Sequence, residues 1–306
     1  MTDLTLRQLE YFVAVLDGGS ITEAARRTSL SQSAVSMAVS QLEKAVGVPL
    51  LIRGASRRIT PTAAGREFAA RARRLLRAAA DMGRDLGDAQ GLPSGVVRVG
   101  VLTAISPRLI PGLLAAARSR WPEIRLEFVE GAAERLQQQV LDGELDIAFV
   151  YSLQAATGVH LRPLAVSSAR AMVGAGHRLA RRQALTFADL ADEDIVLFDV
   201  PPSAERVIGM FEAAGVSPRV RYRSVVAEGI RQIVAAGLAC SVTNVWTGSL
   251  TGEWSAQVRI IPFSDPVPLN HVAAAVVPGI RQPRRVEAVL DLARDVAGGG
   301  TTDEIG

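Results

Sequence analysis

The sequence predicts an α/β protein with an N-terminal winged helix-turn-helix domain, a long linker helix and a larger α/β domain. Residues 20–46 contain two short helical patterns separated by a break of a few residues, and a basic turn follows them. Residues 68–86 carry apolar side chains at coiled-coil spacing. From residue 96 onward, strand patterns alternate with helix patterns, which is typical of a doubly wound α/β domain.

Length and composition fit a globular protein of two domains. The chain has 306 residues, of which 48% are hydrophobic and 21% are charged. No signal peptide pattern and no long uncharged apolar run occurs, so we expect a cytoplasmic protein that does not bind membranes. The single cysteine, Cys240, excludes a disulfide within the chain. We interpret it as a buried thiol, and a single-cysteine redox sensor stays open.

Charge is distributed unevenly along the chain. Residues 1–80 contain 12 Arg and Lys and 6 Asp and Glu, a net charge of +6. The whole chain has 34 and 31, which leaves 22 and 25 for the remainder, a net charge of −3. This asymmetry indicates a polyanionic partner for the first part only, although a solvated basic face would show the same charges.

The first 47 residues predict three helices. Apolar residues recur at helical spacing over residues 6–16. Ser20 is a suitable N-cap for the second helix, and Glu23 completes a capping box with it. Ser31 caps the third helix, which runs to about residue 46 and ends at Gly47.

The third helix has the properties of a DNA recognition helix, because its first turns carry short polar side chains that permit close approach to base edges. Gln32 can pair with adenine, and Met37 can contact a thymine methyl group. For each serine, a solvated helix position explains the residue equally well. Residues 49–60 read as two strands around a basic turn that lies beside the phosphate backbone. The predicted DNA contacts are Ser20, Ser31, Gln32, Ser33, Ser36, Met37, Ser40, Arg53, Arg57 and Arg58.

Many spaced residues of this region resemble the DNA-binding domain of the LysR-type transcriptional regulators. The resemblance is carried by Leu9, Phe12, Gly19, Ser20, Ala24, Ala25, residues 31–36 (Ser-Gln-Ser-Ala-Val-Ser), Leu42, Glu43, residues 47–50 (Gly-Val-Pro-Leu), Arg53, Thr60, Pro61, Ala64 and Gly65. The sequence departs from the family pattern at Ile21, Thr28, Met37 and Leu51. The change at Met37 leaves the base preference open.

A long helix is predicted to begin at Thr60 and Pro61 and to run to about residue 88. Its heptad seam consists of Phe68, Ala72, Leu75, Ala79, Met82 and Leu86. A helix buried within one chain could show the same pattern, but arginines crowd the other faces, so we expect the seam to form a dimer. A dimer implies a nearly palindromic DNA site. The family resemblance points to the same dimer, and it further implies a homotetramer and contact with RNA polymerase.

The second part of the chain resembles the effector-binding region of the same family, through residues 107–114, 143–148, 177–180 and 234–238. The resemblance implies a periplasmic-binding-protein-like domain whose two subdomains are joined by crossovers near residues 163–167 and 264–269. The expected divisions are a DNA-binding domain at 1–60, a linker helix at 61–90, an effector domain at 91–297, with subdomain 1 at 96–164 and 269–297 and subdomain 2 at 165–268, and a disordered tail at 298–306.

Open α/β sheets bind ligands beyond the carboxyl ends of their strands, so we expect an effector between the subdomains. The candidate contacts are Thr103, Ser106, Phe149, Tyr151, Asp199, Ser203, Thr243 and Asn244. Ser106 and Ser203 begin helices, where an anion is favoured, although simple helix capping explains both serines. We expect a small organic acid, with a donor group facing Asp199, although a solvated carboxylate explains that residue equally well.

Two other functions explain the sequence less well. An enzyme is disfavoured because His160, His177 and His271 lack metal-ligand spacing and no nucleotide-binding or nucleophile motif follows a strand. The only lysine, Lys44, lies in the DNA-binding region, which excludes a lysine-linked cofactor in the second domain. A solute-binding protein would need an export signal and would not need residues 1–60. We therefore expect no catalytic activity, cofactor or metal.

Overall fold

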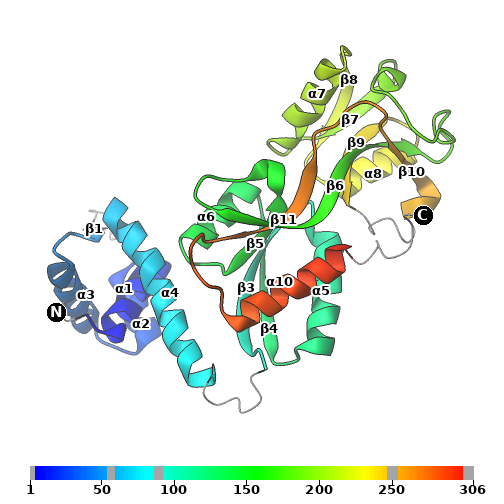
Figure 1. The fold of residues 1–306 in the computed structure, drawn as a ribbon. Coiled ribbons are helices and arrows are strands. Elements are labelled where there is room, and N and C mark those ends of the chain that lie inside the picture. The colour runs from blue at the N-terminus through cyan, green and yellow to red at the C-terminus, as the bar shows by residue number, and fades with distance from the viewer. Residues whose placement is uncertain (1–3, 54–58, 86–91, 247–253, 299–306) are drawn as a thin grey trace.

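The computed structural model describes residues 4–53, 59–85, 92–246 and 254–298 (Figure 1). The N-terminal domain lies at one end of the molecule and packs around a core that includes Phe12, Val35 and Val39. Its elements are α1 (Leu6–Gly18), α2 (Ile21–Thr28), α3 (Gln32–Val46), β1 (Leu51–Arg53), β2 (Ile59–Pro61) and α4 (Ala63–Asp85). Strands β1 and β2 pair antiparallel and form the wing.

Helix capping follows the expectation in part. Ser20 Oγ accepts the Glu23 N–H at 3.1 Å, as predicted for the N-cap of α2. The Glu23 carboxylate, however, binds Arg26 and Arg27 at 2.7 and 2.8 Å instead of closing a capping box. These two hydrogen bonds lower the pKa of Glu23 to about 2.

The linker helix α4 begins later than predicted. Thr60 and Pro61 belong to strand β2, because Pro61 pairs with Leu51 across the wing. The helix begins at Ala63, and Thr62 caps it, since its Oγ1 accepts the Gly65 N–H at 2.9 Å. A Cβ atom at Gly65 would lie 1.9 Å from the Leu50 carbonyl oxygen, so only glycine allows the helix to pass this close to the wing.

The first subdomain of the α/β domain contains a sheet covered by helices on both faces (Figure 1). Strands β3, β4 and β5 are parallel, and β11 joins β5 antiparallel. The core includes Val99, Leu109, Leu136 and Phe149, all fully buried. The elements are β3 (Gly95–Leu102), α5 (Ser106–Arg120), β4 (Ile124–Gly131), α6 (Ala133–Leu141), β5 (Ile147–Tyr151), η1 (Ser152–Gln154), β11 (Asn270–Val276) and α10 (Arg284–Gly298).

The long strand β6 connects the two subdomains. Residues 160–167 of β6 pair with β11, whereas residues 167–174 pair with β9 and β10. A second connection, residues 263–269, returns to β11. The remaining elements are β6 (His160–Gly174), η2 (Ala188–Leu190), β7 (Asp194–Phe198), α7 (Ser203–Ala213), β8 (Arg219–Ser224), α8 (Ala227–Ala235), β9 (Ser241–Trp246), α9 (Trp254–Gln257) and β10 (Val258–Pro262).

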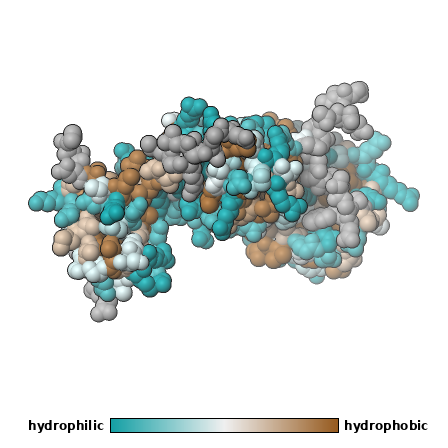
Figure 2. All heavy atoms as spheres, turned by 90° about the horizontal axis from the view of Figure 1, so that it is seen from below, coloured by the Kyte–Doolittle hydropathy of each residue, from teal (hydrophilic) through white to brown (hydrophobic). Residues whose placement is uncertain are grey.

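The strand expected over residues 238–243 begins only at Ser241, because Gly237 turns the chain at a φ of +72° after α8. Cys240 forms only an isolated bridge with Ile195. None of the helices among the described residues is long and apolar enough to span a bilayer. Figure 2 shows a face on which hydrophilic and hydrophobic residues are mixed.

Candidate DNA-binding surface and effector cleft

Helix α3 separates its buried and exposed residues sharply, and it lies at the end of the molecule remote from the α/β domain (Figure 1). Val35, Val39 and Leu42 are fully buried against the rest of the N-terminal domain. On the other side of the helix, Met37 is 61% exposed. The predicted base-contacting residues share this outer side, where Gln32, Ser33 and Ser40 are exposed and Ser36 is half-buried.

The two predicted serine caps serve the helices themselves. Ser31 Oγ accepts the Ala34 N–H at 3.1 Å and lies 2.9 Å from Ser33 Oγ, and Ser20 caps α2. Each hydroxyl therefore sits at a helix N-terminus, where the amide groups favour an anion such as a DNA phosphate. Contact between these serines and DNA stays a prediction.

The wing is attached to the recognition helix through Glu43. Its Oε1 accepts the N–H groups of Leu50 and Leu51 at 2.8 and 3.0 Å, which holds β1 against α3. Arg53 ends β1. Arg57 and Arg58 lie outside the described residues.

The predicted seam of α4 is divided between two environments. Phe68 packs edge-on against Phe12, with ring centres 5.5 Å apart, and Ala72 is buried in the N-terminal core. These contacts are within the chain, which was the alternative explanation of the apolar pattern. Leu75 is 53% exposed and Ala79 is partly exposed, while Leu86 and the side chain of Met82 lie outside the described part of the chain.

Another face of α4 contacts the α/β domain through three arginines, which we call the arginine clamp (Arg73, Arg74 and Arg77). They donate to the carbonyl oxygens of residues 142, 141 and 143 at 3.2, 3.3 and 2.5 Å, respectively. Arg77 also lies 3.4 Å from the buried carboxylate of Asp146. The carbonyls at a helix C-terminus lack partners within the helix and carry negative partial charge, so cations are stabilised there. The clamp thus binds the linker helix to the end of α6.

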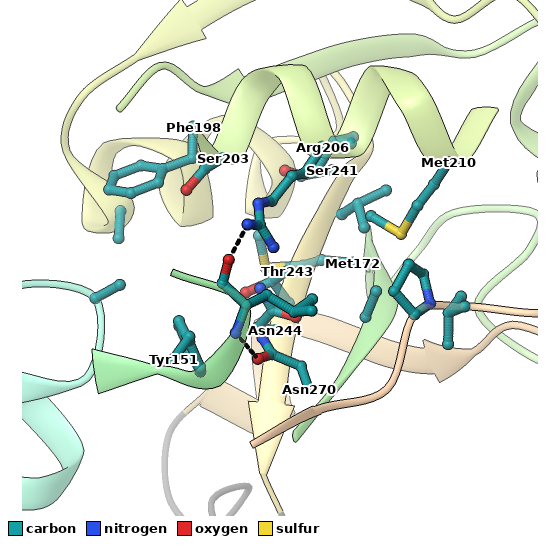
Figure 3. A pocket seen from close by; sticks show the side chains of 18 of the residues that line it. Tyr151, Met172, Phe198, Ser203, Arg206, Met210, Ser241, Thr243, Asn244 and Asn270 are labelled. Atoms are coloured by element: carbon teal, nitrogen blue, oxygen red, sulfur yellow. Dashed lines mark hydrogen bonds between the residues drawn. The ribbon is translucent and has the colours of Figure 1, made fainter. Parts of the chain in front are cut away.

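A cavity of about 920 Å³ lies between the two subdomains. Subdomain 1 contributes Thr103 and Tyr151, and α7 of subdomain 2 contributes Ser203. Figure 3 shows Tyr151 and Ser203 on the walls of this cavity. Thr243 and Asn244 also line it, but from the middle of β9 rather than from its end. The structure thus brings these five predicted residues together around one cavity. Burial raises the pKa of Tyr151 to about 12, so its hydroxyl stays protonated.

Three predicted contacts lie away from this cavity. Ser106 is buried and donates from Oγ to the Thr103 carbonyl, and Phe149 belongs to the core of subdomain 1. Asp199 pairs with Arg223 at 2.8 Å and does not line the cavity. The capping interpretation of both serines is also wrong, because α5 and α7 have Ile105 and Pro202 as N-caps, neither with a side-chain hydrogen bond.

Two separate family models match the chain. Residues 6–66 match the model of the bacterial regulatory helix-turn-helix protein of the lysR family, and residues 90–298 match the LysR substrate binding domain. The chain belongs to the LysR family of transcriptional regulators. Members of this family are DNA-binding transcriptional regulators with an effector-binding domain, and the family is not one of enzymes.

Relatives and solved structures agree with this assignment. The regulator is 31% identical over 247 residues to the transcriptional regulator CbbR of Xanthobacter flavus, which covers 79% of this chain and 73% of that protein. A hydrogen peroxide-inducible genes activator of Pectobacterium carotovorum is 26% identical over 294 residues, covering 95% and 96%.

Two solved structures from Pseudomonas aeruginosa are similar. An OxyR variant has 26% identity and a TM-score of 0.74, covering 96% of this chain and 99% of that one. HinK has 28% identity and a TM-score of 0.61, covering 96% and 98%.

Sequence reasoning missed the two arginines of the cleft, Arg108 and Arg206. The guanidinium of Arg108 lies 5.5 Å from the centre of the Trp246 ring, and burial lowers the pKa of Arg108. Arg206 donates to the Leu153 carbonyl across the cleft (Figure 3). Both arginines lie in the first turn of helices that the sequence predicted, so inspection of the residues after each predicted N-terminus could have found them.

In the described part of the regulator, one cluster has metal-ligating side chains: His177, Glu193 and Cys240, with ligand atoms within 4.8 Å of one another. His177 Nδ1 accepts the Leu179 N–H at 3.2 Å, so Nε2 carries the proton of the neutral ring and lies 3.2 Å from Glu193 Oε2. A ring in this tautomer has no lone pair for a metal at Nε2. Arg178 also binds Glu193, at 2.7 Å, and burial raises the pKa of Cys240 to about 12. We interpret the cluster as structural.

Proposed function

We propose that the regulator binds an interrupted palindrome in double-stranded DNA as a dimer, and that a small organic acid bound between the subdomains modulates this binding. The observation that carries the proposal is the exposed polar side of α3 on a basic domain, with an internal cavity in the attached α/β domain. Basic surface supplies affinity for phosphates, and the exposed side chains supply base readout.

In the proposed complex, the first turns of α3 enter the major groove. Gln32 pairs with an adenine, and Met37 makes apolar contact with a thymine methyl group. Arg53, Arg57 and Arg58 of the wing bind phosphates and position the domain without reading sequence.

Dimerisation supplies the second recognition helix. The exposed Leu75 and the partly exposed Ala79 support a dimer seam along α4, because an apolar side chain that is 53% exposed gains free energy when a partner covers it. Two recognition helices then read half-sites about 34–36 Å apart or a multiple of this spacing. We propose that two such dimers form a tetramer that contacts RNA polymerase. Such a tetramer would bind two DNA sites, and the same effector would modulate binding at both.

The size of the cavity supports the proposed effector. Its volume of about 920 Å³ lies within the roughly 300–1,000 Å³ typical of small-molecule sites. We propose that an acid bound there closes the subdomains on each other and alters the relative placement of the DNA-binding domains in the oligomer.

A mobility-shift assay with the DNA upstream of the regulator's own gene tests this function, with a shuffled duplex of equal length as control. We expect a tighter complex with the upstream DNA, a dimer or larger oligomer by light scattering, and a change in the shift when an organic acid is added. Equal affinity for both duplexes would refute sequence-specific binding, and a monomeric complex would refute the dimer.

A further inference from the structure

The charge of the effector cavity has one sign. Arg108 and Arg206 are the charged side chains among the described residues that line it, and no carboxylate is among them. Most of the remaining wall is apolar, formed by Met172, Phe198, Val207, Met210, Ile230, Val242, Ile260 and Val267. A ligand complementary to this wall combines an anionic group with a sizeable apolar body.

Arg206 is the arginine that joins the two subdomains. It lies in the first turns of α7 in subdomain 2, and its Nη2 donates to the Leu153 carbonyl of subdomain 1 (Figure 3). Among the described residues, no carboxylate lies within ion-pair distance of Arg206. A guanidinium bound to a neutral carbonyl would gain from exchanging it for a carboxylate, since an ionised acceptor makes the stronger hydrogen bond and can accept two N–H groups side by side.

Leu153 does not depend on Arg206 for its position. Its N–H donates to Asn270 Oδ1 at 3.2 Å. The buried Gln137 of α6 holds the following residues, because it donates to the Gln154 carbonyl and accepts the Ala156 N–H, both at 2.8 Å. Release of Arg206 would therefore leave this segment in place and remove only a contact between the subdomains.

We propose that Arg206 is the specificity-determining residue of the cleft, and that it exchanges the Leu153 carbonyl for the carboxylate of an effector whose apolar body packs against Met172, Met210 and Ile230. The effector class is thus an organic acid with an alkyl or aromatic body, such as a medium-chain or aromatic monocarboxylate. This inference rests on the proposed effector function and specifies its ligand.

Arg108 sits in the opposing subdomain and adds to the positive potential of the site. Burial lowers the pKa of Arg108, which reflects the cost of holding its charge away from water, and an anion in the cavity would offset that cost. A neutral ligand of the same shape would gain neither of these electrostatic contributions. The acid must therefore bind more tightly than its amide.

Isothermal titration calorimetry on the full-length protein tests the proposal with two matched pairs, hexanoate against hexanamide and benzoate against benzamide. We expect each acid to bind about 10- to 100-fold more tightly than its amide, the range for a hydrogen bond to a charged group. Arg206→Gln should remove that difference, whereas Arg206→Lys, which retains the charge, should restore part of it.

The control is Arg219→Gln, which removes the same charge from an exposed site on β8 outside the cavity and should leave acid binding unchanged. Circular dichroism melting of each variant reports whether it is folded. Equal binding of acid and amide overturns the proposal, and so does full acid affinity in Arg206→Gln or the absence of binding by every acid at millimolar concentration. A mobility shift on the same preparations shows independently whether the DNA-binding function stands.

Discussion

A single methyl group at position 65 should separate the wing from the linker helix. A Cβ atom on Gly65 would lie 1.9 Å from the Leu50 carbonyl oxygen and 2.9 Å from its carbon. Leu50 is fully buried, its N–H donates to Glu43 at 2.8 Å, and its carbonyl accepts the Thr62 N–H at 3.0 Å. The backbone of the wing is therefore held on both sides and cannot move away without breaking a hydrogen bond.

The cost of Gly65→Ala follows from this geometry. A carbon and a carbonyl oxygen normally stay about 3.3 Å apart, so the helix or the wing must move by more than about 1 Å. Overpacking costs about 1–3 kcal/mol, and loss of the bond from Thr62 to Leu50 adds about 1 kcal/mol. We expect a loss of about 3 kcal/mol, a large share of the roughly 5–15 kcal/mol by which a domain is stable.

Urea unfolding separates the two domains by their chromophores, because Trp121, Trp246 and Trp254 all lie in the α/β domain. Circular dichroism should show an earlier transition in Gly65→Ala, whereas tryptophan fluorescence should barely change, and DNA affinity should fall. Ala64→Gly, an exposed neighbour in the same helix, controls for helix propensity and should cost at most about 1 kcal/mol. An effect of Gly65→Ala no larger than that of Ala64→Gly would refute the steric argument.

Three further predictions follow from the DNA-binding surface, the clamp and the buried thiol. Gln32→Ala should reduce the preference for one base at a single position of the DNA site by about 1–3 kcal/mol, and equal losses of affinity on specific and random DNA would contradict base readout. Arg53→Ala should weaken binding to all sequences and lower the slope of log binding constant against log salt concentration by about 1. Arg77→Met should lower stability in urea by about 2 kcal/mol, because the buried carboxylate of Asp146 loses its cationic partner and keeps the Arg98 N–H. Arg71→Met, on the exposed face of the same helix, should have little effect, and identical midpoints for the two variants would show that the Arg77 contacts contribute nothing. Cys240 should resist thiol reagents at pH 8 in the native state, since burial raises its pKa to about 12 and keeps the thiol protonated. It should react once urea unfolds the chain, and rapid labelling of the native protein would contradict this.

Local patterns predicted the elements of the DNA-binding domain because their causes are local. The turn at Gly19, the cap at Ser31 and the apolar stripe of α3 each depend on residues within one or two turns. The wing-to-helix boundary was misplaced at Thr60, because pairing across the wing overrides the local tendency of Thr-Pro to begin a helix.

The cleft was predicted only in outline. The segments that follow the strands form the walls of the cleft. Thr103, Tyr151 and Ser203 could therefore be found by looking where the predicted strands end. The contact of Arg206 across the cleft could not, because its partner Leu153 is 53 residues distant along the chain. Asp199 does not line the cleft because it forms an ion pair with Arg223 on the neighbouring strand, a pairing that no local pattern reveals.

The arginine clamp has a genetic consequence. Its acceptors are main-chain carbonyls of residues 141–143, and every residue type carries one. Most substitutions at 141 and 142 therefore leave the acceptors intact, whereas Gly143 has a φ of +67° and a Cβ atom there would lie 3.1 Å from the Ala70 carbonyl oxygen of α4. The donors on α4 have no such redundancy, because only arginine offers a planar set of N–H groups at that reach. A screen for variants with a weakened contact between α4 and the α/β domain should therefore recover changes at Arg73, Arg74 and Arg77 more often than changes at residues 141 and 142.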